Sequence, residues 1–388
     1  MQPVEDVLNS LVIDQLSLSL SPSSLQMRSS LLILCTLLAA VMHTVNASTP
    51  VYDGKDGHGH GAPSRDHNNG GSHHGQCTTL LERKEWRVLT DEGKHDYIRA
   101  VKCLQKLPAK RPVNPASVSR FDEFQGFHIS MAERVHLAGQ FLPWHRQFLK
   151  RYELALQNEC HYKGAAPYWD WTQDADEFSS IKGSPIFDPV TGFGGDGVSG
   201  TYTIPANVNS VPQLVPTIPS KFKGCVGDGP FANLTLHMGP GKLNTTHCLT
   251  RGIDNTLRVR LNSAAVANTT KQRTFEDFRV QLEGQPVTDS PRIHDGGHFS
   301  VGGDMSNFYS SPGDPIFYLH HANLDRVWWN WQQMLPHRLY EITGRSTINP
   351  PYVNVTLDFP LIMAPLGPTV PIREVMDIHS VPSCYTYV

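Results

Sequence analysis

The sequence predicts a mainly α-helical fold, in which a four-helix bundle forms the core and long ordered loops with a few short strands connect the helices. Four segments of the 388-residue chain place apolar residues at helical spacing. The 31 Gly and 29 Pro together make up about 15% of the chain, which is above average usage and favours long loops. From Cys77 onward the chain shows neither an internal repeat nor a linker. One mainly helical domain is therefore the simplest architecture.

The four helical segments follow one another along the chain. The first opens with a Thr cap and acidic residues and ends before Pro108, as expected for a helix start and stop. Between the second and the third, residues 172–220 are rich in Pro and Gly without periodicity, and we expect an ordered loop there. The predicted helices are Thr90–Leu107, Arg146–Cys160, Thr274–Gly284 and His320–Leu335.

The segment that begins at Met27 has the layout of a secretory signal peptide, with a basic start, an apolar stretch (Leu31–Met42) and small residues ending at Ala47. We therefore expect cleavage near Ala47 and secretion from the cell. The apolar stretch is shorter than the roughly 20 residues of a membrane-spanning helix, so a membrane anchor is the weaker interpretation. Residues 1–26 carry acids where a signal carries bases, and the true start stays open. Residues 1–47 are interpreted as an N-terminal extension plus a signal peptide.

Residues 48–76 form a His- and Gly-rich segment ahead of the predicted domain, which we assign to residues 77–388. The apolar content of this segment is too low to offset the entropy lost on ordering, so we expect a flexible leader. Its histidines could collect metal ions for a site elsewhere, but a solvated leader without a metal role is the simpler interpretation. These histidines are His58, His60, His67, His73 and His74.

Composition excludes two classes of protein. With 39% hydrophobic and 18% charged residues, the chain suits a globular core rather than disorder throughout. Its formal net charge is -3, so no excess of positive charge is present to neutralise a nucleic-acid backbone. We expect neither a nucleic-acid partner nor stable membrane association, and the oligomeric state stays open.

Cysteine usage agrees with export. Six cysteines follow the signal segment, and an even count in an exported chain suggests disulfides. Their pairing stays open, apart from a predicted Cys225–Cys248 bridge, because these two residues flank one Gly- and Pro-rich loop. After the signal segment the chain also carries four Asn-x-Ser/Thr sites that are candidate glycan acceptors, Asn233, Asn244, Asn268 and Asn354.

Six histidines fall into two groups of three. The first group comprises His128, His136 and His145, which lie in FDEFQGFHISMAERVHLAGQFLPWHRQF. The second comprises His294 and His298, four residues apart and so on one face of a helical turn, and His321 in the fourth predicted helix. Neutral imidazole is the commonest protein ligand for copper and zinc, and three imidazoles can form one open metal site. The sequence therefore indicates two candidate metal sites.

Unrelated core histidines are the alternative to two metal sites. Six such residues would bring many buried polar nitrogens that each need a separate partner, so we favour the metal sites. Ligation by imidazole alone suits copper or a catalytic zinc better than structural zinc, which prefers thiolate. Aromatic residues accompany both groups, with Phe127, Phe141, Trp144 and Phe148 near the first and Phe299, Phe317, Tyr318, Trp328 and Trp329 near the second.

The stretches HISMAERVHLAGQFLPWHRQF and IHDGGHFSVGGDMSNFYSSPGDPIFYLHHANLDRVWW resemble the two copper-binding motifs of the tyrosinase and catechol oxidase family, in particular its short secreted fungal members. The resemblance covers most of the chain from Cys77 to the end and includes PYWDW (Pro167–Trp171) and the terminal CYTYV. It implies a centre of two copper ions that binds dioxygen and acts on a small phenolic substrate. It places the first three histidines on one copper ion and the second three on the other.

The doubled histidine before the last aromatic run needs an assignment. The resemblance makes His321 the ligand and leaves His320 in a supporting position. Asp325 lies one helical turn after His321 and could accept the other N–H of a ligand ring. A salt bridge on the helix surface, with Arg326 or Arg146, is the alternative for Asp325.

Three further residues bear on the reaction through the same resemblance. Glu283 resembles the acid that holds a water near the entrance as a base, although it could instead end its helix on the surface. Asp295 takes the place of an Asn that strong monophenol hydroxylases often carry, and Phe308 lies where the family has a gate over the metals. These residues imply oxidation of o-diphenols (catechols) to o-quinones by dioxygen, with weak or absent hydroxylation of monophenols. A true tyrosinase with strong hydroxylation is the alternative.

Other features separate this chain from some relatives. Arg134 stands where many long fungal relatives carry a Cys linked to the second histidine, so no thioether bond is expected. The chain ends soon after its last aromatic run, and activation by removal of a C-terminal lid is not expected.

A reversible dioxygen carrier of the haemocyanin type is a competing function that a single short chain argues against. A zinc hydrolase is another, weakened because no His-Glu-x-x-His motif is present.

Overall fold

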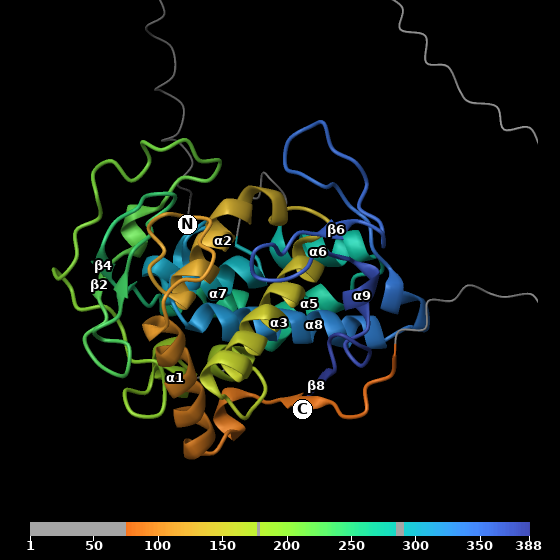
Figure 1. Ribbon diagram of the computed structural model, residues 1–388, viewed down its shortest axis with the longest axis horizontal. Helices are drawn as coiled ribbons and strands as arrows, with labels where there is room; N and C mark the ends of the chain where they lie inside the picture. Colours follow the sequence, from red (N-terminus) through yellow and green to blue (C-terminus); the bar gives the residue numbers. More distant parts are fainter. Residues whose placement is uncertain (1–74, 177–178, 285–290) are drawn as a thin grey trace, which may run out of the picture. The chain divides into compact units, whose positions relative to one another are not determined.

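Helices fill the middle of the protein in the computed structural model, which describes residues 75–176, 179–284 and 291–388 (Figure 1). These residues belong to one compact unit, Gly71–Val388. The predicted N-terminal extension, the signal peptide and nearly all of the predicted leader lie outside the described residues. Across the described part of the chain, no helix is both long and apolar enough to cross a membrane.

The described chain is mainly helical, as predicted, and its strands are short. The α-helices are α1 (Asp91–Lys106), α2 (Arg120–Val135), α3 (Phe141–Cys160), α4 (Thr172–Ala175), α5 (Ser263–Thr270), α6 (Phe275–Glu283), α7 (Ile293–Val301), α8 (Ile316–Gln333) and α9 (Arg373–Met376). Short 3-10 helices are η1 (Trp86–Val88), η2 (Ile181–Gly183), η3 (Pro185–Phe187), η4 (Pro219–Lys221), η5 (Asn255–Arg260), η6 (Gly303–Ser306), η7 (Ser311–Gly313) and η8 (Pro336–Tyr340).

The strands form two-stranded sheets at the edges of the helical core. Parallel pairing of β1 with β8 joins the two ends of the described chain, and the others are antiparallel, β2 with β5, β3 with β4 and β6 with β7. The strands are β1 (Leu81–Arg83), β2 (Gly224–Cys225), β3 (Thr235–Leu236), β4 (His247–Cys248), β5 (Thr250–Arg251), β6 (Pro360–Leu361), β7 (Val370–Pro371) and β8 (Tyr385–Tyr387).

Three disulfides tie these elements together. The Cys77–Cys384 bridge lies beside the β1–β8 pair, and the Cys103–Cys160 bridge joins α1 to the end of α3. The predicted Cys225–Cys248 bridge is confirmed and links β2 to β4. All six cysteines that follow the signal segment are therefore paired.

The four predicted helices are confirmed as α1, α3, α6 and α8. The Thr90 hydroxyl accepts the Gly93 N–H at 3.2 Å and begins α1 as expected. Helix α3 begins at Phe141, five residues before its predicted start. Pro143 does not prevent this, because it lies in the first turn, where a backbone N–H makes no intrahelical hydrogen bond. Helix α8 begins at Ile316, four residues before its predicted start.

Helix α2 carries the first candidate ligand and was not predicted. A capping box begins it, in which Ser119 and Asp122 each bond the backbone N–H of the other. Every residue from Arg120 to Ile129 is buried, and these include the polar residues Asp122, Glu123 and Gln125, so polarity does not show which residues of α2 face the core. The described residues of the expected loop over residues 172–220 hold only α4 and three 3-10 turns and are otherwise irregular, as predicted.

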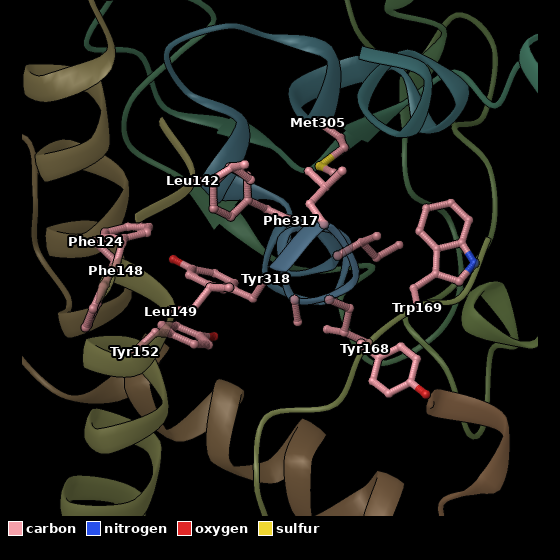
Figure 2. Close-up of a cluster of buried hydrophobic side chains, with 14 of the residues drawn as sticks. Phe124, Leu142, Phe148, Leu149, Tyr152, Tyr168, Trp169, Met305, Phe317 and Tyr318 are labelled. Atoms are coloured by element: carbon pink, nitrogen blue, oxygen red, sulfur yellow. The ribbon is translucent and has the colours of Figure 1, made fainter. Parts of the chain in front are cut away.

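An aromatic core lies against the histidine-bearing helices. Tyr152 of α3 stacks on Tyr318 of α8 with ring centroids 3.5 Å apart, and Phe124 of α2 contacts Phe148 of α3 at 5.7 Å (Figure 2). Phe317 lies in the same cluster. Helix α3 also contacts both α1 and α8. These contacts fix α2, α3 and α8 relative to one another, which is what brings distant histidines together.

Candidate metal centre

The first predicted group of histidines is one cluster in space. His128 lies in the second half of α2, His136 caps its C-terminal end, and His145 lies in the first turns of α3. One ring nitrogen from each residue lies within 4.8 Å of those of the other two. All three side chains are buried. The C-terminal end of α2 and the N-terminal end of α3 therefore place three imidazoles close together.

The second predicted group is also a cluster. His294 and His298 lie one turn apart on α7, and His321 reaches them from α8. Their ligand nitrogens again lie within 4.8 Å of one another, and Nε2 of His298 is 3.1 Å from Nε2 of His321. The chain between the two helices passes through η6 and η7, and Gly296 and Gly297 lie between the two histidines of α7.

The two clusters face each other. The rings of His145 and His321 stack with centroids 4.5 Å apart and planes inclined by 16°. His136 and His294 approach each other with ring centroids 5.9 Å apart. The six imidazoles therefore surround one shared space rather than two separate ones.

Aromatic rings close this space on the side of the core. Phe141 and Phe317 each contact histidine rings of both clusters. Two of the aromatic residues predicted near the second group lie elsewhere, since Phe299 faces a lysine ammonium and Trp329 packs against His379. The site is thus lined by fewer aromatic rings than the sequence pattern indicated.

Backbone carbonyl groups fix the tautomer of four of the six rings. A carbonyl oxygen only accepts hydrogen bonds, so each Nδ1 bonded to one carries the hydrogen and each Nε2 keeps a lone pair. The bonds are His128 to Tyr309, His136 to Ala132, His145 to Phe141 and His298 to Met305, with Nδ1–O distances of 2.7, 2.9, 2.9 and 2.7 Å. These rings therefore present lone pairs to the shared space.

Three ring nitrogens of the six candidate ligands have no partner. Nε2 of His128, His145 and His294 is buried without a hydrogen-bond partner among the described residues. Burial lowers the pKa of all six histidines, to about 4 for His136 and His298. The imidazoles are therefore neutral near pH 7, which is the form that binds a metal ion.

The residues present fit a pair of copper ions. Metal–imidazole bonds are about 2.0–2.1 Å long, so two nitrogens on one ion lie about 3 Å apart, as the Nε2 atoms of His298 and His321 do. Each cluster offers three imidazoles and neither thiolate nor carboxylate, a donor set that suits copper. A cation in each cluster would also satisfy the unpaired buried nitrogens.

His320 occupies the supporting position that the resemblance gave it. The Trp171 indole N–H donates to its Nδ1 at 3.0 Å, and an indole nitrogen can only donate. Nε2 of His320 must therefore carry the hydrogen, which it donates to the carbonyl oxygen of His294 at 3.1 Å. Both nitrogens of His320 are used, so this ring cannot bind a metal ion without breaking the link between α7 and α8.

Gly297 is required by this arrangement. A Cβ atom at this position would lie 2.1 Å from Cε1 of His320, a ring that is hydrogen-bonded at both nitrogens. We expect Gly297→Ala to displace α7, to lower the copper content of the purified protein, and to reduce the free energy of unfolding by about 1–3 kcal/mol. Metal analysis and urea unfolding measure these effects.

Gly183→Ala is the matched control for this variant. Its added Cβ would lie 3.7 Å from the nearest atom, which is ordinary contact, so copper content and stability should stay at wild-type values. A Gly297→Ala protein with full copper content and unchanged stability would contradict the role given to the His320 ring.

Asp325 does not bond a ligand ring, so that prediction was wrong. Its carboxylate is buried, with Oδ1 2.5 Å from Nε of Arg146 and Oδ2 accepting the hydroxyls of Tyr385 and Tyr387 at 2.6 Å each. The salt bridge with Arg146 was the alternative, but it lies in the interior rather than on the helix surface. Asp325 therefore joins α3, α8 and β8.

Glu283 ends α6 but is buried, so the interpretation as a surface helix end was wrong. Its Oε1 accepts the Leu137 N–H at 2.5 Å, and its Oε2 lies 3.2 Å from the Arg279 guanidinium. Leu137 follows His136 directly and has a φ of 55°, in the left-handed region. Burial raises the pKa of Glu283 to about 8, and Arg279 opposes that rise. Glu283 thus holds the backbone next to a candidate ligand.

Asp295 and Phe308 both lie at the candidate centre. Oδ1 of Asp295 is 3.2 Å from Nδ1 of His294, and its side chain is 29% exposed. The Phe308 ring lies 4.7 Å from the His136 ring and is half-buried. Both residues are therefore partly exposed neighbours of buried histidines.

Two functional contacts were missed from the sequence. Trp171 belongs to the PYWDW segment and reaches His320 from far along the chain. The carbonyl group of Tyr309 orients His128 across 181 residues. No side-chain pattern identifies a backbone acceptor. The sequence signal that could have identified Trp171 is its position two residues after Trp169, in a segment that begins with Pro167.

Known proteins are similar to the part of this chain that carries the candidate metal centre. The profile described as the common central domain of tyrosinase matches residues 118–334, a span that contains all six clustered histidines. Tyrosinase P from Aspergillus terreus is 34% identical over 341 residues, which is 80% of this chain and 93% of that protein. An N-acetyl-6-hydroxytryptophan oxidase from Emericella nidulans is 32% identical over 339 residues, which is 79% of this chain and 91% of that protein.

A solved structure is similar along nearly its whole length. A polyphenol oxidase variant from Thermothelomyces thermophila superimposes with a TM-score of 0.69 at 34% identity. The match covers 80% of this chain and 89% of that chain. Sequence and fold therefore point to the same group of proteins.

Proposed function

The chain belongs to the tyrosinase family, and on this premise we propose that it oxidises o-diphenols to o-quinones with dioxygen, with weak or absent hydroxylation of monophenols. Proteins of this family are oxidases with a dinuclear copper centre. The observation that carries the proposal is the pair of facing histidine clusters, whose Nε2 lone pairs point into one shared space.

We propose the six clustered histidines as the copper ligands. His128, His136 and His145 would hold one ion, and His294, His298 and His321 the other. When bound, the copper pair supplies the transfer of electrons from the phenol to dioxygen. Two o-diphenols, each giving up two electrons and two protons, reduce one dioxygen molecule to two waters.

The protein contributes orientation and exclusion of water. Hydrogen bonds from Nδ1 to carbonyl oxygens hold the rings in place, so little reorganisation accompanies metal binding. Phe141 and Phe317 close the inner side of the centre. Phe308 offers an aromatic face beside His136, against which a phenol ring can pack.

Two contacts favour weak hydroxylation. Hydroxylation of a monophenol needs a group that removes the phenol proton. Glu283 is held by Arg279 and the Leu137 N–H, and Asp295 faces the His294 ring, so both acids already have partners. An o-diphenol does not depend on such a base to the same extent, since it is oxidised without insertion of oxygen.

The relatives support a phenolic substrate without selecting one. One is named a tyrosinase and another an oxidase of N-acetyl-6-hydroxytryptophan, which carries a hydroxyl on an aromatic ring. We therefore propose hydroxylated aromatic compounds as the class.

Oxygen uptake with a matched pair of substrates tests this proposal. Copper-loaded protein is given 4-methylcatechol or 4-methylphenol, which differ only in one hydroxyl group. We expect oxygen uptake with the catechol to be at least about a hundredfold faster than with the phenol, because the phenol must be hydroxylated before it can be oxidised to the quinone. Fast uptake with the phenol and without added catechol would show a strong hydroxylase, and oxygen binding without any turnover would show a carrier.

We also propose that the protein is secreted and glycosylated. Its three disulfides agree with an oxidising compartment. Asn233 is exposed and is the preferred glycan acceptor, whereas the carboxamide oxygen of the exposed Asn244 accepts from the Asn114 side chain at 3.0 Å. The Asn354 carboxamide oxygen accepts hydrogen bonds from Thr343 and from the Gly344 N–H, so this side chain already has a structural role.

A further inference from the structure

A short loop, residues 209–217, closes on itself near the candidate centre and is called the 209–217 loop below. Oδ1 of Asn209 accepts the Thr217 N–H at 2.8 Å and a Gln213 side-chain N–H at 2.6 Å. The Thr217 hydroxyl in turn accepts from the Asn307 side chain at 2.9 Å. Both ends of the loop are thus fixed, and one end is tied to the segment that carries Phe308.

The tip of the loop is held by the hydroxyl of Tyr309. This oxygen accepts the backbone N–H groups of Leu214 at 2.6 Å and of Val215 at 3.2 Å, and it donates to Oε1 of Glu133 at 2.8 Å. Lys242 pairs with the same carboxylate oxygen at 2.6 Å. Oε1 of Glu133 also accepts the Leu214 N–H at 3.2 Å. The Tyr309 hydroxyl and the Glu133 carboxylate therefore together attach two consecutive amides of an otherwise irregular loop to the C-terminal half of α2.

Tyr309 also lies next to the candidate ligands. Its carbonyl oxygen orients His128, and the preceding residue, Phe308, contacts the His136 ring. Phe308 and Val215 pack against the same small apolar cluster, which consists of Ile129, Ala132, Met238 and Tyr309. The loop and the partly exposed Phe308 ring therefore share one support.

We propose that the 209–217 loop is an apolar wall of the substrate entrance beside Phe308, and that the Tyr309 hydroxyl sets its position. This inference rests on the proposed function and adds the substrate class, o-diphenols that carry an apolar ring substituent. Val215 is half-buried and Leu214 is 42% exposed, so apolar surface remains uncovered at this rim. A substituent that covers this surface gains affinity in proportion to the area removed from water.

Tyr309→Phe isolates the role of the hydroxyl. The aromatic ring, its contact with the Lys242 ammonium and the carbonyl bond to His128 all remain. We expect faster hydrogen exchange in peptides that contain Val215, whose N–H bonds the Tyr309 hydroxyl, whereas the Leu214 N–H keeps its bond to Glu133. This readout needs no metal. We also expect the ratio of kcat/KM for 4-tert-butylcatechol to that for catechol to fall about fivefold, mostly through KM, as the loss of one hydrogen bond implies.

Tyr162→Phe is the matched control, because it also removes one buried hydroxyl, which donates to the Ala165 carbonyl away from the loop. Copper content should equal that of the wild type in both variants. Val215→Ala should lower the same substrate ratio without loss of the amide protection that Tyr309 provides.

The outcomes separate the inference from the proposed function. If wild-type protein with two coppers oxidises no phenol, the proposed function fails. If wild-type protein is active but Tyr309→Phe leaves the substrate ratio or the hydrogen exchange of the loop unchanged, or raises the ratio, the wall is disproved and the proposed function stands. A fall in the ratio together with faster exchange supports the inference.

Discussion

Replacing His298 with Ala should abolish oxidation of catechols and leave about one copper ion per chain. This ring lies between His294 and His321 in the second cluster and is oriented by the Met305 carbonyl oxygen. Loss of a residue that only orients a ligand costs about 10–100-fold, so loss of the ligand itself should exceed a hundredfold in turnover. Oxygen uptake and metal analysis on the same sample measure both effects.

His337→Ala is the control for this variant, since the His337 side chain is 67% exposed and lies on η8. It should retain two copper ions and full activity. Retention of both copper ions and of catechol oxidation by the His298→Ala protein would remove this residue from the proposed ligand set.

Breaking the buried ion pair of Asp325 should have the largest effect on stability. Arg146 and Arg83 both lie near this carboxylate and are almost fully buried, and two tyrosine hydroxyls of β8 donate to it. Asp325→Asn leaves the Arg146 charge without its partner in the interior. We expect the free energy of unfolding to fall by about 3–5 kcal/mol.

Urea unfolding of the copper-free protein measures this change, because bound metal would add its own stabilisation. Asp358→Asn is the matched control. The Asp358 side chain is 77% exposed and pairs with Arg373, and such surface pairs contribute at most about 1 kcal/mol. Equal effects of the two substitutions would show that the interior pair is not what holds β8 to the helices.

The sequence predicted the fold class and the grouping of the histidines because both depend on local pattern. The spacing of His294 and His298 places both on one turn of α7, and Thr90 begins α1 as its cap. Helix α2 was not predicted because polar residues such as Glu123 and Gln125 are buried in it, so residue polarity does not mark its inner face. The bundle around the metal centre therefore consists of α2, α3, α7 and α8, only two of which were predicted from periodicity.

The contacts that position the ligands could not be predicted, because they join residues far apart in the chain. Asp325 was assigned to a ring one helical turn away, whereas it pairs with Arg146 of another helix and with the C-terminal strand. The carbonyl group of Tyr309 and the indole of Trp171 reach their histidines only because the fold brings distant parts of the chain together. Local spacing identifies which residues can bind metal, and tertiary packing determines how they are held.

Electron paramagnetic resonance of the oxidised, copper-loaded protein, combined with metal analysis, tests the central claim most directly. Two Cu(II) ions held by facing imidazole clusters, with rings only 4.5 Å apart, should couple magnetically. We predict two copper ions per chain and almost no resonance signal. A full signal from isolated Cu(II), or a preparation that binds zinc in place of copper, would contradict the paired copper centre.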